Sequence, residues 1–202
     1  MYGTIAFYKE ALKQGIKPII GCEVYVAPKS RFDNFEVEGT RYYHLILLAE
    51  NNKGYQNLIK LVSLANIEGM YYKPRVDKDL LRQYHEGIIC LSSCIAGEIP
   101  QAIIRDNMER AEKLVQEYVD IFGKDNFFLE IQNHQIPEEA KANKGLISLA
   151  QKYDLKLVQK PHYGMRVEGR EFNKRLCLAA IYISYIDQRD DFPGNQFNSN
   201  DL

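Results

Sequence analysis

The sequence predicts an α/β fold in which helices cover a parallel sheet, arranged as a barrel or as part of one. Two observations carry this prediction. Strand-like runs alternate with helical segments along the 202 residues, and the runs are apolar almost throughout, as in strands buried on both faces. A third observation favours the barrel over doubly wound nucleotide-binding folds, because no GxGxxG or GxxxxGK[ST] motif follows any expected strand.

Five short runs rich in aliphatic and aromatic residues are the expected strands. They comprise residues 18–26, 44–49, 87–92, 126–131 and 155–159. The polar stretch 30–41 is expected to be an excursion loop between the first two strands. We expect the five strands to run parallel within an open, incomplete barrel.

Four helices are expected between and before these strands, from apolar positions at helical spacing and from residues typical of helix ends. They cover residues 6–13, 55–65, 100–122 and 137–153. Asn51 or Asn52 is the expected N-cap of the second helix, and Pro137 begins the fourth. Gly15 and Gly123 are expected to end the first and third helices.

The composition is that of an ordinary globular domain. Apolar residues make up 46% and charged residues 26% of the chain, which argues against disorder. The net charge of −1 argues against binding nucleic acid by charge alone. No apolar stretch is long enough for a membrane helix, and no signal peptide is visible. We therefore expect no membrane association, a cytoplasmic location and reduced thiols at Cys22, Cys90, Cys94 and Cys177.

Chemically versatile side chains stand near the ends of the expected strands, where parallel α/β folds collect their functional groups. They are Cys22, Glu23, Cys94, Glu130, Gln132, His134 and His162. Glu, His and Cys together suit zinc, manganese or iron, although the same residues are compatible with unrelated buried polar groups. His44 does not fit the pattern, because it precedes the apolar run of its strand.

Five segments, in this order, resemble the PHP (polymerase and histidinol phosphatase) domain of the bacterial DNA polymerase III alpha subunit. They are IIGCEVYV (19–26), YHLILLA (43–49), YYKPRVD (71–77), LSSCIAGEIP (91–100) and LEIQNH (129–134). The resemblance covers about residues 1–163. It implies an α/β fold of the PHP type, a (β/α)₇ barrel whose strand ends hold up to three metal ions.

The resemblance carries four metal ligands over to this chain: Glu23, His44, Cys94 and His162. Zinc or manganese is the implied metal. The His-x-His strand and the Asp-His pair with which the family opens are absent, and Lys160 stands where the family has an aspartate. We therefore expect an incomplete barrel with an incomplete site, formed by a partial PHP domain over residues 1–163. Residues 164–202 are expected to be a divergent C-terminal helix followed by a disordered tail.

The resemblance implies an N-terminally truncated fragment of a replicative polymerase subunit, whose parent binds DNA and other replicase subunits. Three roles remain open: a structural module, a residual metal-dependent 3′–5′ exonuclease site, and a stand-alone metal-dependent phosphoesterase. We expect the structural role, with no independent activity of the fragment. A barrel that lacks its first strands exposes an unpaired edge, so we also expect self-association.

One further cluster combines basic and aromatic residues: Tyr71, Tyr72, Lys73, Arg75 and Arg82. Such a cluster suits contact with DNA or with a neighbouring domain. It is equally compatible with a solvated loop, because a short run of this kind does not differ from ordinary surface charge.

Overall fold

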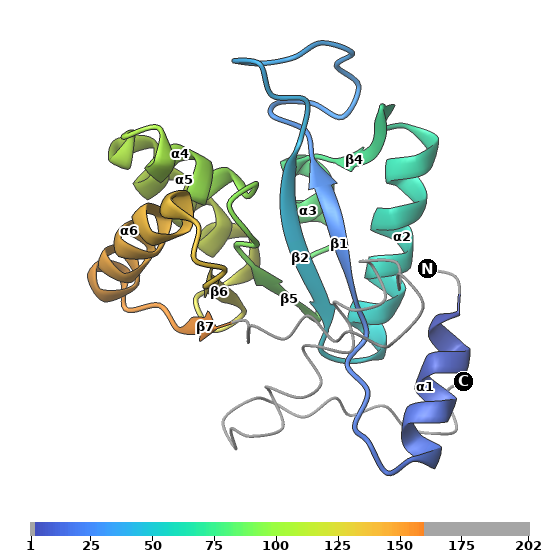
Figure 1. Cartoon of the computed structure of the whole chain (residues 1–202). Coiled ribbons are helices and arrows are strands. Elements are labelled where there is room, and N and C mark those ends of the chain that lie inside the picture. Colours follow the sequence, from blue (N-terminus) through green and yellow to red (C-terminus); the bar gives the residue numbers. More distant parts are fainter. Residues whose placement is uncertain (1–2, 160–202) are drawn as a thin grey trace.

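A mixed seven-stranded sheet organises the chain over residues 3–159, the part that the computed structural model describes (Figure 1). The strands are β1 (Gly21–Val26), β2 (Tyr43–Ala49), β3 (Met70–Tyr71), β4 (Lys73–Val76), β5 (Ile88–Leu91), β6 (Phe127–Ile131) and β7 (Leu157–Gln159). Their order in the sheet is β3-β4-β1-β2-β5-β6-β7. All five expected strands are therefore present, each within three residues of its expected bounds.

Six helices accompany the sheet in the described range. They are α1 (Thr4–Lys13), α2 (Asn52–Ile67), α3 (Lys78–Gln83), α4 (Glu98–Ile104), α5 (Met108–Phe122) and α6 (Pro137–Tyr153). Four expected helix ends are confirmed. The Asn51 side chain caps α2 by accepting from the Gly54 N–H, and Pro137 begins α6. Gly15 follows the C-cap of α1 with a φ of 70°, and Gly123 follows α5 with a φ of 82°. None of the described helices is long and apolar enough to cross a membrane.

The expectation of an all-parallel sheet is wrong. β2 runs antiparallel to both of its neighbours, β1 and β5, whereas β4 is parallel to β1, and β5, β6 and β7 are parallel to one another. The physical reason lies in residues 27–42, which contain no helix. Without a crossover helix the chain returns beside β1 in the opposite direction, as in a long hairpin.

Two further differences are local. The expected helix 100–122 is two helices, because Asp106 has a φ of 59° and the Asn107 side chain then caps α5 by accepting from the Arg110 N–H. The segment 70–83, for which no element was expected, contains the β3–β4 hairpin and α3. The hairpin strands and α3 are short, so their side chains show little periodicity in the sequence.

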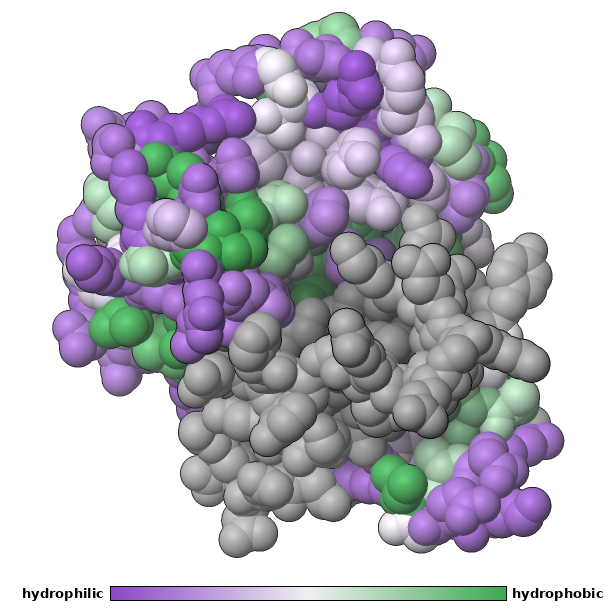
Figure 2. Space-filling view, in the orientation of Figure 1, coloured by the Kyte–Doolittle hydropathy of each residue, from purple (hydrophilic) through white to green (hydrophobic). Residues whose placement is uncertain are grey.

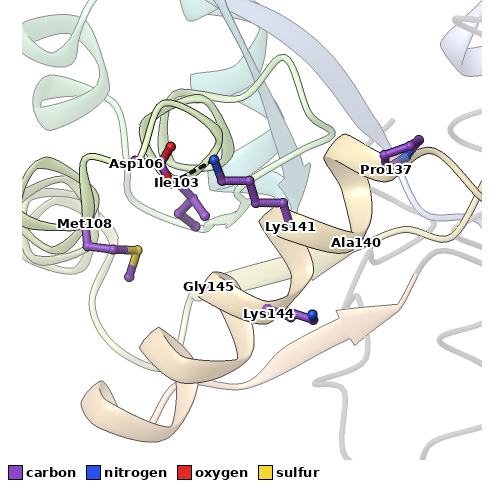
Figure 3. Close-up of a pocket in the computed structure, with 8 residues that line it drawn as sticks. All are labelled: Ile103, Asp106, Met108, Pro137, Ala140, Lys141, Lys144 and Gly145. Atoms are coloured by element: carbon purple, nitrogen blue, oxygen red, sulfur yellow. Dashed lines mark ion pairs between the residues drawn. The ribbon is translucent and has the colours of Figure 1, made fainter.

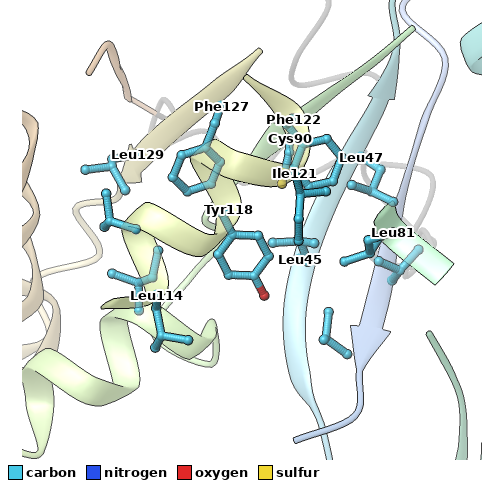
Figure 4. Close-up of a cluster of buried hydrophobic side chains, with 14 of the residues drawn as sticks. Leu45, Leu47, Leu81, Cys90, Leu114, Tyr118, Ile121, Phe122, Phe127 and Leu129 are labelled. Carbon is cyan, nitrogen blue, oxygen red and sulfur yellow. The ribbon is translucent and has the colours of Figure 1, made fainter. Parts of the chain in front are cut away.

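The main hydrophobic core lies between one face of the sheet and the helices (Figure 4). Strand residues such as Leu45, Leu47 and Leu129 meet residues from each of the helices α2 to α6, and the rings of Tyr118 and Phe127 stack with centroids 5.5 Å apart. The opposite face of the sheet carries a separate cluster: Ile19, Ile46, Leu48, Ile89, Leu91, Phe128 and Val158. No residue of the described helices belongs to that second cluster.

Candidate metal centre

Several of the metal ligands expected from the sequence lie at one edge of the sheet, where strands end. The carboxyl ends of β1, β5 and β6 lie at this edge because these strands run in the same direction. β2 is antiparallel to them, so its first residues lie there as well, and His44 is paired with Tyr25 near the end of β1. The antiparallel direction of β2 thus explains why a ligand candidate precedes its strand instead of following it.

His44 contacts two of the other expected ligands. Its Nδ1 lies 3.0 Å from Oε1 of Glu23 and 3.7 Å from Sγ of Cys94. Glu23 comes from β1, His44 from β2 and Cys94 from the loop after β5, so three separate segments converge. His162, the fourth expected ligand, lies outside the described residues.

The Cys94 loop is fixed to the sheet by backbone hydrogen bonds. The backbone N–H of His44 donates to the carbonyl of Ala96 at 3.0 Å, and the N–H of Gly97 donates to the carbonyl of Cys94 at 2.8 Å. A Cβ at position 97 would lie 2.2 Å from the Ser92 carbonyl oxygen, so this tight turn requires glycine. The loop therefore holds Cys94 close to the imidazole.

Mutual interactions favour the charged forms of His44 and Cys94. The hydrogen bond with Cys94, followed by that with Glu23, raises the pKa of His44 to about 10 against the opposing effect of burial. Burial acts to raise the pKa of the Cys94 thiol, but hydrogen bonds from His44 and from the backbone of Ala96 outweigh it, and the net pKa is lowered. The cluster is thus suited to an imidazolium beside a thiolate and a carboxylate.

Carboxylate, imidazole and thiolate together form a donor set of the kind that zinc takes in proteins. The chemistry of the three side chains therefore fits such an ion. Their present arrangement is one of hydrogen bonds, with both partners directed at the same nitrogen of His44. Among residues 3–159, no group of three His, Cys, Asp or Glu side chains has an arrangement ready to hold a metal ion.

Two tyrosines beside His44 were not expected from the sequence. The Tyr42 ring lies parallel to the imidazole, with centroids 6.1 Å apart, and the Tyr25 ring meets the imidazole edge-on at 5.3 Å. The alternation of β1 contained a signal for Tyr25, because residues 23 and 25 share one face of a strand. Tyr42 precedes β2 and could not be assigned a face.

Polar residues of β6 and of the segment that follows it form a second group. Gln132 donates to Glu130 at 2.6 Å, and Glu130 is buried. Glu139 of α6, 5% exposed, accepts from the backbone N–H of His134 and also contacts its Nδ1, both at 2.6 Å. The structure thus pairs His134 with Glu139. No pattern in the sequence pointed to Glu139.

A groove of about 450 Å³ lies elsewhere, in the helical layer between α4 and α6 (Figure 3). Ile103, Met108 and Gly145 line its apolar part, and Lys141 pairs with Asp106 across it at 2.7 Å. None of the expected metal ligands in the described range lines this groove. It therefore adds nothing to the candidate site.

Comparison with known proteins places the chain in a family. Residues 1–134 match the PHP domain. The DNA polymerase III subunit alpha of Treponema pallidum is 48% identical over 181 residues, which is 88% of this chain and 16% of that protein. The subunit alpha of Thermus aquaticus is 43% identical over 201 residues, 98% of this chain and 16% of that protein.

The same name and coverage recur for Aquifex aeolicus, whose DNA polymerase III subunit alpha is 43% identical over 171 residues, 81% of this chain and 15% of that protein. The chain thus spans about one sixth of the length of the relatives that it matches. The match to the PHP domain covers well over half of the chain and includes Glu23, His44 and Cys94. The chain belongs to the PHP domain family.

Proposed function

We propose that the chain is the PHP module of a replicative DNA polymerase III alpha subunit and acts in DNA replication. The support is the alignment of polymerase subunits with up to 98% of its length. In that setting its partners are DNA and the other replicase subunits, in the bacterial cytoplasm. The observation that carries the functional proposal is the convergence of Glu23, His44 and Cys94 from three separate segments.

The proposed architecture is a PHP-type (β/α)₇ barrel. Barrels carry their helices on the outer face of the sheet, whereas doubly wound sheets carry them on both faces. The described helices α2 to α6 all contribute to the core on one face, and none contributes to the cluster on the other. This one-sided arrangement supports a curved sheet whose inner face carries Glu23 and His44.

The proposed module extends over residues 1–163, beyond the 134 residues that match the family. α6 packs its buried side chains Leu146, Leu149 and Ala150 into the same core as the other helices. β7 continues the sheet by pairing parallel to β6, from Leu129 opposite Leu157 to Ile131 opposite Gln159. A boundary at residue 134 would remove both elements from the core and the sheet that they complete.

The proposed metal ligands are Glu23, His44 and Cys94, joined by His162, with zinc or manganese as the ion. When bound, such an ion supplies positive charge that stabilises the negative charge developing on a phosphate group. Glu23 and Cys94 offer anionic donors to balance the ion, and His44 offers Nδ1 once its proton is released. The loop between Ser92 and Gly97 keeps Cys94 in place for this role.

The module's main role is structural, with at most a residual 3′–5′ exonuclease site. Phosphodiester hydrolysis of this kind uses two ions about 4 Å apart, which requires more donors than the four proposed here. Lys160 lies outside the described residues, but it stands in the sequence where the family has an aspartate, and a positive charge at that position would oppose cation binding. We therefore expect one weakly held ion and no independent hydrolytic activity.

The test is metal content by plasma mass spectrometry after dialysis, beside hydrolysis of a single-stranded oligonucleotide with added manganese or zinc. We expect less than one ion per chain and no hydrolysis above that of Glu23→Ala. Glu10→Ala is the matched control, because Glu10 is an exposed glutamate of α1. Two or more tightly held ions, with activity abolished by Glu23→Ala alone, would overturn the structural role.

The isolated chain is also proposed to self-associate. Within residues 3–159, the end strands β3 and β7 each pair on one side alone, and such edges promote association between chains. Light scattering coupled to chromatography should therefore give a mass above 23.4 kDa that rises with concentration. A single monomer peak at every concentration would contradict this proposal.

A further inference from the structure

Tyr72 occupies a position that is costly for a tyrosine. It is the single residue between β3 and β4, its φ is 60°, and it is 67% exposed. A positive φ favours glycine or asparagine, and an aromatic residue there is strained. Because the ring is mostly exposed, burial does not compensate for this strain. Non-glycine residues with such backbone angles concentrate at functional positions.

Two exposed rings in this part of the molecule each carry an arginine. The guanidinium of Arg41 lies 4.1 Å from the centroid of the Tyr72 ring, and that of Arg31 lies 4.2 Å from the centroid of the Phe32 ring. Phe32 is 60% exposed. Flat aromatic and guanidinium surfaces of this kind are the ones on which unpaired nucleic-acid bases stack.

A fully buried arginine holds both pairs in place. Arg75 in β4 donates to the carbonyl oxygens of Arg31 at 3.1 Å, Asp33 at 2.7 Å and Arg41 at 3.3 Å. The Arg31 side chain is fixed in turn by its ion pair with Asp77 at 3.0 Å. The loop between β1 and β2 is therefore attached through three carbonyl groups to the strand that follows Tyr72, and through Arg31 to Asp77 beyond that strand, which preorganises the exposed rings.

One of the two ring–arginine pairs adjoins the His44 cluster along the chain. Arg41, which covers Tyr72, is followed directly by Tyr42, whose ring lies parallel to the imidazole of His44. Tyr42 also contacts Tyr25, with centroids 4.6 Å apart. In the space-filling view, the end of the molecule formed by the β1–β2 loop is mostly hydrophilic with small apolar groups between (Figure 2).

We propose that Phe32, Arg41, Tyr42 and Tyr72 form a platform that binds single-stranded DNA and directs it toward His44. Bases stack on the exposed rings and on the guanidinium planes, while Lys73 beside Tyr72 contacts the phosphates. The Nε–H of Arg41 donates to Glu36 at 2.6 Å, so part of its charge is already balanced. Stacking therefore contributes more to the affinity than charge does. Only one part of this proposal rests on the proposed function, namely that the bound DNA is directed toward His44.

Single-stranded DNA fits this platform better than duplex DNA does. A duplex keeps its bases stacked inside the helix and presents mainly phosphates, which a chain with a net charge of −1 attracts poorly. Exposed rings without a continuous basic stripe select unpaired bases. Because stacking contributes more than charge, the affinity should depend only modestly on salt concentration.

The test is fluorescence anisotropy of a labelled oligothymidylate with the full chain in EDTA, so that binding is measured without metal. Tyr72→Asn should weaken binding about tenfold, the effect of one lost base–aromatic stack. The same variant should unfold no more easily than the parent, because asparagine tolerates a positive φ. Tyr72→Phe should retain the affinity. Leu12→Asn, which removes an exposed apolar side chain from α1, is the matched control.

Because binding is measured in EDTA, it does not depend on a bound metal ion, so failure of the metal site and failure of the platform give different results. Equal affinity for a duplex of the same length would overturn the proposal, as would unchanged binding by Tyr72→Asn. Loss of self-association in Tyr72→Asn, without any binding of the oligonucleotide by the parent, would assign the platform to a second copy of the chain instead.

Discussion

Two histidine–glutamate pairs at the same edge of the sheet differ in what holds them. His134 and Glu139 are five residues apart, and the buried carboxylate accepts from both the backbone and the ring of His134 at 2.6 Å. His44 and Glu23 come from different strands, their contact is 3.0 Å, and Cys94 joins them from 50 residues further along the chain. The first pair closes a loop, and the second connects three parts of the fold.

The difference shows that the residue types alone do not identify a binding site. In the local pair, Glu139 contacts the backbone and the ring of His134, only five residues away in the sequence. Such a contact within one loop is typical of a structural role. In the distant cluster, a carboxylate and a sulfur atom from separate segments meet at one nitrogen of His44, and the pKa of that ring is raised to about 10. Convergence from distant segments, and not the presence of histidine beside glutamate, separates the candidate metal site from a loop closure.

The largest effect is expected at the local pair. Glu139→Ala removes a buried carboxylate together with its two hydrogen bonds to His134, so the free energy of unfolding should fall by about 2–4 kcal/mol. Denaturation with urea measures this change. Glu138→Ala, at the exposed neighbouring position, is the control and should change the stability by less than about 0.5 kcal/mol. Equal effects of the two substitutions would show that the contact between Glu139 and His134 does not stabilise the fold.

A smaller effect is expected from zinc. At a zinc concentration ten times its dissociation constant, the parent chain should gain about 1.4 kcal/mol of stability. His44→Ala should abolish this gain, whereas His134→Ala and the exposed control His85→Ala should keep it. Thermal unfolding with and without zinc measures all four proteins. A gain that depends on His134 would remove the distinction between the two pairs.

The smallest effect concerns pH. A raised pKa means that His44 stabilises the fold fully below about pH 6.5, its ordinary range, and that this contribution is lost as the pH rises through about 10. Since the cluster is partly solvated, we expect a loss of about 1 kcal/mol or less between pH 7 and pH 10. Urea denaturation in EDTA should show this loss in the parent and a flatter profile in His44→Gln. Parallel profiles would mean that His44 is not charged at neutral pH.

The positions of the strands were predicted correctly from the sequence, but the direction of β2 was not. Apolar runs such as 44–49 identify buried strands because burial requires apolar side chains in either direction. Direction depends on the connection, and residues 27–42 contained the relevant clue, since a parallel crossover of that length usually holds a helix. The β3–β4 hairpin escaped prediction because strands of two and four residues show no alternation.

The residues of the candidate site could be predicted from the sequence, but their arrangement in space could not. Glu23, His44 and Cys94 follow from the family resemblance, and the structure brings these three together. The contributions of Tyr25 and Tyr42 depend on the register between β1 and β2, which no single segment encodes. Glu139 was missed because a buried carboxylate in the first turn of a helix has the same sequence pattern as an ordinary exposed one.

The pairing of His44 with Tyr25 also determines which changes of chain length the protein tolerates. Insertions in the loop between β1 and β2 can be accommodated before His44 without altering the pairing of the strands. A deletion of one residue inside β2 shifts every preceding side chain to the opposite face of the sheet. It would turn His44 toward the helices and direct Leu45 at Glu23. Among related proteins, we therefore expect the β1–β2 loop to vary in length, whereas β2 should vary by substitution and not by insertion or deletion.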